Sequence, residues 1–347
     1  MQLTHNNHFV PQAYLRRWSD DRQNIWCYRI LVPNKKVHEW IQKPVKGVAY
    51  QPDLYTNSNG ELELDEFERW LEGEIETPAQ NAIDRALHGD ILTSSDWEHL
   101  LRYMAAQDVR TPQHYITSMK RWNDQLPEIM QKTIDKLMRK LKEAKRTGSK
   151  LRTEDATINN PFANVIKVKI DRNARPETKQ AEISITVLAG RRLWIDEQRH
   201  ALNGIVKVLY NHSWIIVKAA NNIEWITSDN PVTRLNDYGD GRYDFKGGWN
   251  NKGSTLFMPL SPEYLLITEV GKDLKNLSTL SDLLTYKIQK YTVENADRMI
   301  FAHKPISFIN KLHPRIVDPK LYLEEQEAWR NWHSDQSRAE RDHDEGK

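Results

Sequence analysis

The chain has 347 residues, of which 39% are hydrophobic and 28% charged, with a net charge of +2. This mixture is typical of a globular protein. The single cysteine, Cys27, excludes an internal disulfide framework and a cysteine-built zinc site, and it fits a reducing compartment. Because Cys27 lies between Trp26 and Tyr28, a small core residue is a simpler interpretation than a nucleophile.

The N-terminal segment has no basic flank followed by an apolar run, so it does not have the pattern of a signal peptide. No stretch approaches the about 18–20 apolar residues of a membrane span. We therefore expect a cytoplasmic protein with no membrane segment. The small net charge neither requires nor excludes nucleic acid as a partner, and nothing in the sequence indicates an oligomeric state.

The first part of the chain combines a short helix with two strands. Pro11 is typical of a first helical turn, and the segment after it carries Tyr14 and Trp18. Apolar β-branched and aromatic side chains then predict a strand over residues 24–32, a turn, and a second strand over residues 36–41.

Residues 61–146 carry apolar side chains at helical spacing, which predicts a block of helices. Ser95 and Glu98 have the spacing of a capping box before one of these helices. Pro112, directly after Thr111, is expected to interrupt that helix or to start the next, long one.

The end of the long helix is basic. Nine Lys or Arg residues stand between residues 131 and 152, against two acidic residues. Such a stripe could contact several phosphates of a nucleic acid through Lys136, Arg139 and Lys140. The alternative is a solvated helix face, which is the more common origin of a charge run on a long helix.

Residues 162–268 contain most of the predicted strands, with a helix over residues 196–208 among them and a long loop over residues 236–253. Helices return near residue 278, and the last 14 residues form a polar tail that we expect to be solvated or frayed. The strand segments are residues 164–170, 181–188, 213–220, 223–228 and 263–270.

These elements predict an α+β fold, in which the helical block (residues 61–146) packs beside a mostly antiparallel sheet (residues 162–268), followed by C-terminal helices. We expect a single α+β domain over residues 1–315 and a helical, polar C-terminal tail over residues 316–347.

Motifs that specify a known chemistry are missing from the sequence. There is no phosphate-binding loop, no dinucleotide-binding glycine pattern, no HExxH, no GxSxG and no kinase signature. The acidic and lysine residues of segment 171–179 have the wrong spacing for a metal nuclease and are typical of a charged turn. We therefore expect no cofactor and no metal site.

Polar side chains crowd the N-terminus, where Asn7, His8, Gln12 and Tyr14 lie within eight residues. Histidine is the usual general acid or base near neutral pH, and amides and phenols bind and orient polar substrates. The structural alternative is that Asn7 or His8 caps the short helix that follows.

Two further polar clusters lie far along the chain. Gln107, Arg110 and His114 share one helical face if the helix continues, and Arg110 could clamp a phosphate or bridge to an acid within the fold. Asp229 and Asn230 follow a predicted strand and precede a proline, where they could present polar groups at a site or simply form a turn.

Taken together, these segments resemble the bacterial domain of unknown function 4238 family, in order and in rough spacing over nearly the whole chain. Trp18 stands where the family pattern suggests a smaller aromatic residue, usually Phe. The segments that carry the resemblance are residues 7–12 with 14–16, Gln107 with residues 110–112, residues 227–231, and residues 259–262.

The resemblance implies a bacterial protein, with some family members found among mobile-element genes that block phage, and it implies no settled reaction. It favours one shared site for the three polar clusters. Our first hypothesis is a defence effector that cleaves RNA without a metal. In it His8 is the general acid or base, Tyr14 assists, Arg110 stabilises charge on the phosphorus centre, and Asp229 orients His8.

In the same hypothesis, the substrate is bound by side chains of all three clusters and of the basic helix. The first alternative is a binding module that senses a phage protein or a nucleotide, and the second is a transferase that uses a nucleotide. The substrate-binding candidates are Asn7, Gln12, Gln107, Asn230, Lys136, Arg139 and Lys140.

Overall fold

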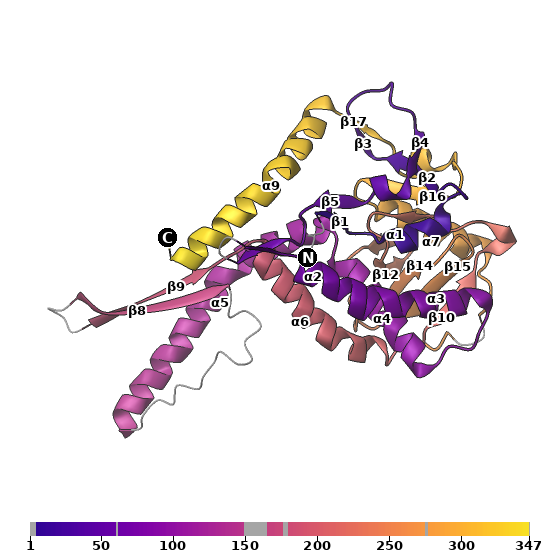
Figure 1. The fold of residues 1–347 in the computed structure, drawn as a ribbon. Coiled ribbons are helices and arrows are strands. Elements are labelled where there is room, and N and C mark those ends of the chain that lie inside the picture. The colour runs from indigo at the N-terminus through magenta and orange to yellow at the C-terminus, as the bar shows by residue number, and fades with distance from the viewer. Residues whose placement is uncertain (1–4, 60–61, 149–164, 176–179, 275–276, 347) are drawn as a thin grey trace.

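The computed structural model describes residues 5–59, 62–148, 165–175, 180–274 and 277–346, and it has the α+β fold that the sequence predicts. Helices pack beside antiparallel sheets (Figure 1). The helices are α1 (Gln12–Leu15), α2 (Glu66–Trp70), a π-helical segment (Leu71–Glu76), α3 (Thr77–His88), α4 (Ser94–Val109), α5 (Pro112–Thr147), α6 (Arg191–Leu209), α7 (Asp282–Glu294), α8 (Ile309–Leu312) and α9 (Pro319–Glu345).

Two antiparallel sheets form the β part of the body. The five-stranded sheet has the order β10 (Ile215–Lys218), β15 (Tyr264–Glu269), β14 (Ser254–Pro259), β12 (Thr233–Gly239) and β13 (Arg242–Asp244). The four-stranded sheet has the order β11 (Thr227–Ser228), β16 (Met299–Ala302), β2 (Asn24–Arg29) and β4 (Trp40–Pro44), so it joins the N-terminal strands to a late one.

Four strand pairs complete the β structure. Three are antiparallel, and the pair of β3 with β17 is parallel and joins the N-terminal part to the segment before α9. The pairs are β1 (Asn6–His8) with β5 (Tyr50–Pro52), β6 (Asn57–Asn59) with β7 (Leu62–Leu64), β8 (Ile166–Arg175) with β9 (Gln180–Val187), and β3 (Leu31–Val32) with β17 (Ile316–Val317).

Several predicted boundaries are wrong. The strand expected over residues 24–32 breaks at Ile30 into β2 and β3, and the next strand begins at Trp40 rather than near residue 36. Only Thr227–Ser228 of the strand expected over residues 223–228 is paired. The expected loop over residues 236–253 contains a hairpin, because Asp240 and Gly241 both have positive φ and connect β12 to β13.

The helix boundaries show how capping chemistry operates in this chain. A capping box is present before α4, but Thr93 and Asp96 form it, two residues earlier than the expected pair Ser95 and Glu98. The predicted interruption at Pro112 is confirmed, because Thr111 is the N-cap of α5 and its hydroxyl accepts a hydrogen bond from the backbone N–H of His114.

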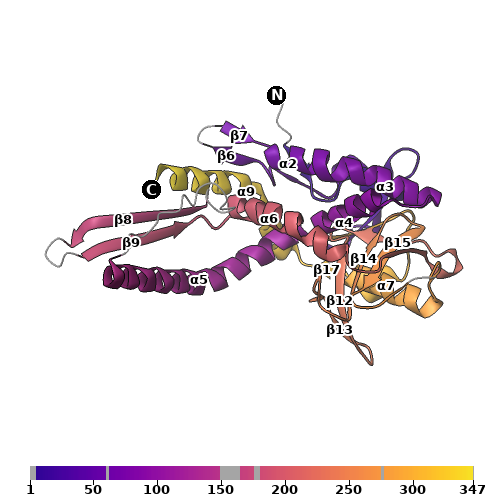
Figure 2. The same cartoon turned by 90° about the horizontal axis from the view of Figure 1, so that it is seen from below.

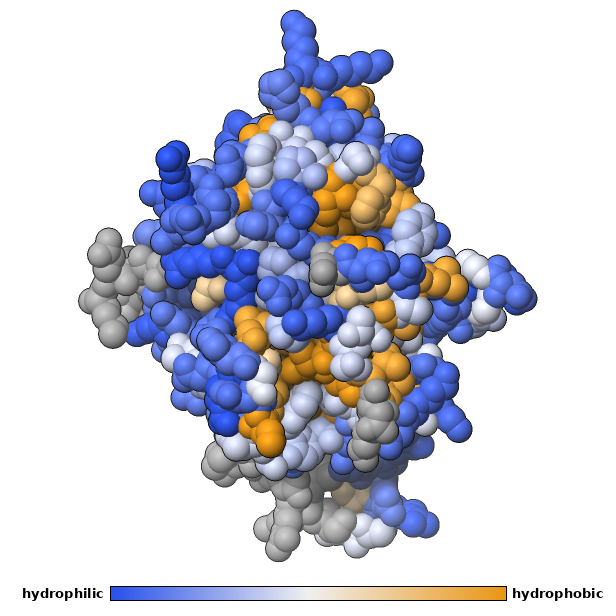
Figure 3. All heavy atoms as spheres, turned by 90° about the vertical axis from the view of Figure 1, so that its right-hand side faces the viewer, coloured by the Kyte–Doolittle hydropathy of each residue, from blue (hydrophilic) through white to orange (hydrophobic). Residues whose placement is uncertain are grey.

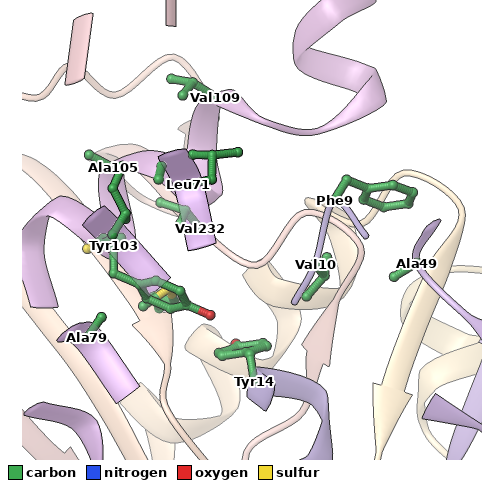
Figure 4. Close-up of a cluster of buried hydrophobic side chains, with 14 of the residues drawn as sticks. Phe9, Val10, Tyr14, Ala49, Leu71, Ala79, Tyr103, Ala105, Val109 and Val232 are labelled. Carbon is green, nitrogen blue, oxygen red and sulfur yellow. The ribbon is translucent and has the colours of Figure 1, made fainter. Parts of the chain in front are cut away.

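The N-terminal segment is part of the main hydrophobic core rather than a surface cap. Phe9, Val10, Tyr14 and Trp18 are all less than 5% exposed, and Figure 4 shows the Tyr14 ring facing the side chain of Tyr103 from α4. The core therefore joins the first helix, the helical block and the sheets in one body.

Helix α9 corrects the expectation of a solvated tail. Ser337, Glu340 and His343 are buried, although the segment is polar in sequence. Glu340 accepts two charge-assisted hydrogen bonds from Arg191 at the start of α6, at 3.0 and 2.7 Å, and both side chains are at most 1% exposed. Pairing removes most of the cost of burying these charges, so a polar helix can dock on the body.

The distal half of α5, residues 131–147, projects away from the body, and the β8–β9 hairpin projects on the same side (Figures 1 and 2). Figure 3 shows the opposite face of the molecule, which is mostly hydrophilic with apolar residues gathered near its middle. None of the described helices combines the length and the apolar character needed to cross a bilayer.

We predict that replacing Glu340 with Gln lowers the free energy of unfolding by about 3–5 kcal/mol, because the variant leaves the Arg191 charge buried and uncompensated. Urea unfolding checks this, with Glu327→Gln on an exposed part of α9 as the matched control. The double variant Arg191→Met/Glu340→Met should recover most of the loss. An unchanged unfolding midpoint in Glu340→Gln would show that the ion pair does not hold α9.

Candidate functional site

Tyr14 joins three of the sequence segments that carry the family resemblance. Its hydroxyl donates a hydrogen bond to the carbonyl of Pro259 at 2.7 Å and lies 2.8 Å from Oγ1 of Thr227. The side chain is fully buried, and burial raises the pKa of the phenol well above its usual value. The segments therefore do converge, and the point where they meet at Tyr14 lies inside the core.

Arg110 joins the middle segment to the N-terminal one. Its guanidinium donates to the carbonyl of His8 at 2.8 Å, forms a close ion pair with Glu76, and lies 3.8 Å from Glu68. Arg110 is only 1% exposed. This arrangement neutralises the Arg110 cation and occupies its hydrogen-bond donors inside the protein. The neighbouring Gln107 is fully buried, and its side chain has no hydrogen-bond partner among the described residues.

Asp229 is buried and holds the turn that leads into β16. Its carboxylate accepts hydrogen bonds from the backbone N–H groups of Asp297, Arg298 and Met299 at 2.7–3.0 Å. Burial and the nearby Asp297 carboxylate raise the pKa of Asp229 to about 7, although Arg298 and the amides act in the opposite direction. The carboxylate thus fixes the backbone at positions 297–299.

Asn230 and Asn7 also have local partners. The Asn230 side chain donates to the carbonyl of Asn295 at 3.1 Å, and Asn295 donates back to the Asn230 carbonyl at 3.2 Å. Asn7 is fully buried, and its Oδ1 accepts a hydrogen bond from the backbone N–H of Tyr55. Both side chains therefore tie loops together.

His8 differs from the other catalytic candidates because its ring is partly exposed. Nε2 lies 3.3 Å from the carbonyl of Lys46, and Nδ1 lies 3.5 Å from the amide nitrogen of Gln12. Burial lowers the pKa of His8 below its usual value, which favours a neutral ring near pH 7. Within the described residues, no hydrogen bond or ion pair joins the side chains of His8, Arg110 and Asp229.

The polar segments instead support the wall of a cleft of about 440 Å³, between the antiparallel β1–β5 pair, β16 and α9. Tyr50 lies directly opposite His8 in this pair, and their ring centres are 5.6 Å apart. The turn held by Asp229 contributes Arg298 and Met299 to the lining. No pattern in the sequence indicates this cleft, because Tyr50 and the α9 residues belong to none of the three polar clusters.

The basic candidates lie elsewhere, on the distal half of α5. Lys136, Arg139 and Lys140 are exposed. Residues 131–147 contain seven basic and two acidic side chains, so they carry +5. Because the whole chain carries +2, all other residues together carry −3. Of the nine basic residues of the predicted stripe, Lys150 and Arg152 lie outside the described residues.

Metal-binding groups among the described residues and similarity to known proteins are two further sources of evidence on the site. Among the described residues, no group of three or more His, Cys, Asp or Glu side chains is placed to hold a metal ion. A family model described as "Protein of unknown function (DUF4238)" matches residues 6–305. No curated protein and no solved structure matches the chain.

His114, next to the middle segment, makes stability depend on pH. Its Nδ1 accepts a hydrogen bond from Trp194 at 3.0 Å, and burial, with Arg121 and Arg234 nearby, lowers its pKa to about 3. The unfolded chain binds this proton below about pH 6.5. Since the folded protein does not, its stability is complete above that pH and falls as the pH is lowered toward 3.

We predict that wild-type protein loses about 2 kcal/mol more than His114→Asn between pH 7 and pH 5, because asparagine offers an acceptor to Trp194 that does not titrate in this range. Urea unfolding at several pH values measures the difference, and His38→Asn, an exposed histidine, is the control. Parallel pH profiles for wild type and His114→Asn would contradict the prediction.

Proposed function

Since the chain belongs to the DUF4238 family of proteins of unknown function, whose description gives no reaction, we propose from the geometry that it binds nucleic acid, RNA above all, through the distal half of α5. The observation that carries this proposal is the separation of charge. Residues 131–147 carry +5 on a projecting helix, and the rest of the chain carries −3.

The helix presents its charges in a form that suits a polyanion. Lys136, Arg139 and Lys140 are spaced three and four residues apart, so they lie on one face. Residues 131–147 span about 25 Å at 1.5 Å per residue, a length over which a nucleic acid strand presents several phosphates. Only two acidic side chains interrupt this stretch, Asp135 and Glu143, and neither forms an ion pair with these three cations within the described part of the chain.

In this proposal the exposed cations would contact phosphates rather than base edges, so RNA and DNA are both candidates on charge alone. We name RNA because it is the substrate of the nuclease hypothesis, and DNA is the comparison in the experiment. Binding of this kind weakens as salt concentration rises, because bound counterions are released from the nucleic acid.

We predict that Lys136→Gln/Arg139→Gln/Lys140→Gln weakens binding of a single-stranded RNA and lowers the slope of log K against log salt concentration by about 2, because each phosphate that a cation neutralises on a single strand contributes about 0.7 to that slope. Fluorescence anisotropy from about 50 to 200 mM salt measures both quantities. The matched control is Lys35→Gln/Lys36→Gln/Lys252→Gln, which removes three exposed cations from the body.

Equal affinity and slope in the two triple variants would overturn the distal half of α5 as the binding surface. If the wild-type protein binds neither RNA nor DNA at low salt, the alternative of a module that senses a phage protein gains support. Tighter binding of a DNA of the same sequence would replace RNA as the ligand.

A second proposal concerns cleavage, and the observation that favours it is the state of His8. Of the four catalytic candidates, Tyr14, Arg110 and Asp229 are buried with protein partners, whereas the His8 ring is partly exposed beside Tyr50 of the cleft. A neutral imidazole can accept a proton from a ribose hydroxyl. In this proposal His8 is the general base of RNA cleavage in an antiphage effector, and the buried residues hold its surroundings.

We predict that His8→Ala lowers RNA cleavage by about 10²–10⁴-fold, the usual contribution of general acid–base catalysis. Cleavage of a labelled RNA measures this, with His38→Ala as the control and phage plaque counts as the readout in cells. Equal cleavage and equal protection by His8→Ala and wild type would remove the catalytic proposal and leave RNA binding untouched.

A further inference from the structure

The cleft between the β1–β5 pair, β16 and α9 has a smaller neighbour of about 150 Å³, and Arg29, Tyr50 and Met299 line both spaces. Arg29 and Met299 are directly opposite each other in the pairing of β2 with β16. The two spaces therefore adjoin at a wall made by two paired strands, and one ligand could occupy both.

The smaller space is cationic. Arg29 and Lys43 line it, and no acidic side chain of the described residues does. Among the described residues, no carboxylate lies within ion-pair distance of Arg29 or Lys43. By contrast, Arg298 in the larger space forms an ion pair with Glu325 at 2.6 Å. Burial raises the pKa of Cys27, which also lines this space, to about 12, so the thiol adds no negative charge. Such a space favours an anion with several acceptor oxygens.

The larger space combines aromatic rings with arginine side chains. Tyr50 is 38% exposed, and its ring centre lies 5.6 Å from that of His8. The Arg29 guanidinium lies over the ring of Tyr322 at 5.3 Å, and the Arg298 guanidinium lies over the ring of Trp329 at 5.5 Å. Aromatic rings and guanidinium planes are both platforms on which a planar base stacks.

Hydrogen bonds from other segments hold both walls of the cleft. Ala49 has a φ of 51°, an unfavourable conformation for a residue with a Cβ, and its carbonyl accepts hydrogen bonds from the N–H groups of Phe9 and Val10. These bonds fix the start of the strand that presents Tyr50. On the other wall, the Asp229 carboxylate fixes Arg298 and Met299 through their backbone N–H groups.

We infer that this double cleft binds a nucleoside phosphate, with the phosphate on Lys43 in the small space and on Arg29 at the boundary of the two spaces, and with the base beside Tyr50 in the large one. The nucleoside phosphate is either a free nucleotide or the phosphorylated end of an RNA strand. The inference concerns a surface separate from the distal half of α5, so it does not depend on nucleic acid binding there.

The test uses the full chain and isothermal titration with AMP, GMP, adenosine and inorganic phosphate, and with an RNA strand that carries either a 5′-phosphate or a 5′-hydroxyl. If the ligand is a free nucleotide, we expect AMP or GMP to bind more tightly than adenosine or inorganic phosphate. If the ligand is an RNA end, we expect the RNA with a 5′-phosphate to bind more tightly than the RNA with a 5′-hydroxyl. Arg29→Met should weaken that binding about 10- to 100-fold, as expected for loss of hydrogen bonds to a charged group. Tyr50→Leu should weaken it by roughly 5- to 100-fold through lost stacking.

Arg22→Met, an exposed arginine before β2, is the matched control and should bind as wild type does. The triple variant of α5 should also bind AMP normally, which separates this inference from the proposed function. Circular dichroism checks that Arg29→Met is folded. Phosphate binding as tight as that of AMP would overturn the aromatic half of the site, and binding unaffected in folded Arg29→Met would overturn the site itself.

Discussion

Arg110 is a buried cation, and the need to neutralise it organises the centre of the molecule. The guanidinium contacts Glu68 of α2, Glu76 of the π-helical segment and the carbonyl of His8 in β1. It also lies over the ring of Tyr55. Removing a partner from a buried charge costs several kcal/mol, so these segments are constrained to pack together. The position of the β1–β5 pair, and with it one wall of the cleft, follows from this constraint.

Local chemistry in the sequence was sufficient for the fold class and for much of the helical part. Helical spacing and Pro112 predicted α4 and α5, since capping and proline geometry act over a few residues. The strands β14 and β16 escaped prediction. β14 pairs with the next strand, β15, whereas β16 pairs with β2 near the start of the chain, a partner that no local pattern indicates. The polar face of α9 gave no sign of burial, since the partner of Glu340 lies in α6, 149 residues earlier.

The candidate site shows the same division. The polar segments could be found in the sequence, and their side chains could not be assigned to a surface or to the interior. In the sequence alone, Tyr14, Arg110 and Asp229 are plausible catalytic residues. In the structure, their polar atoms bind backbone carbonyls, acidic side chains and backbone amides inside the protein. Conversely, Arg29 and Tyr50 belong to no motif in the sequence and line a cleft because two strands pair in a given register.

The family match ends at residue 305, whereas one wall of the cleft belongs to α9. The last helix therefore lies outside the matched region, although it supplies Tyr322 and Trp329 to the cleft and Glu340 to the buried ion pair with Arg191.

The uneven charge of the molecule has a kinetic consequence. A protein with a positive projection and a negative body has a large electric dipole, and the field of a polyanion turns such a particle before contact. If the chain binds nucleic acid as proposed, encounters would begin at the tip of α5, while the acidic remainder of the protein would be kept away from the nucleic acid. The same polarity would slow head-to-head approach of two copies and favour head-to-tail encounters between them.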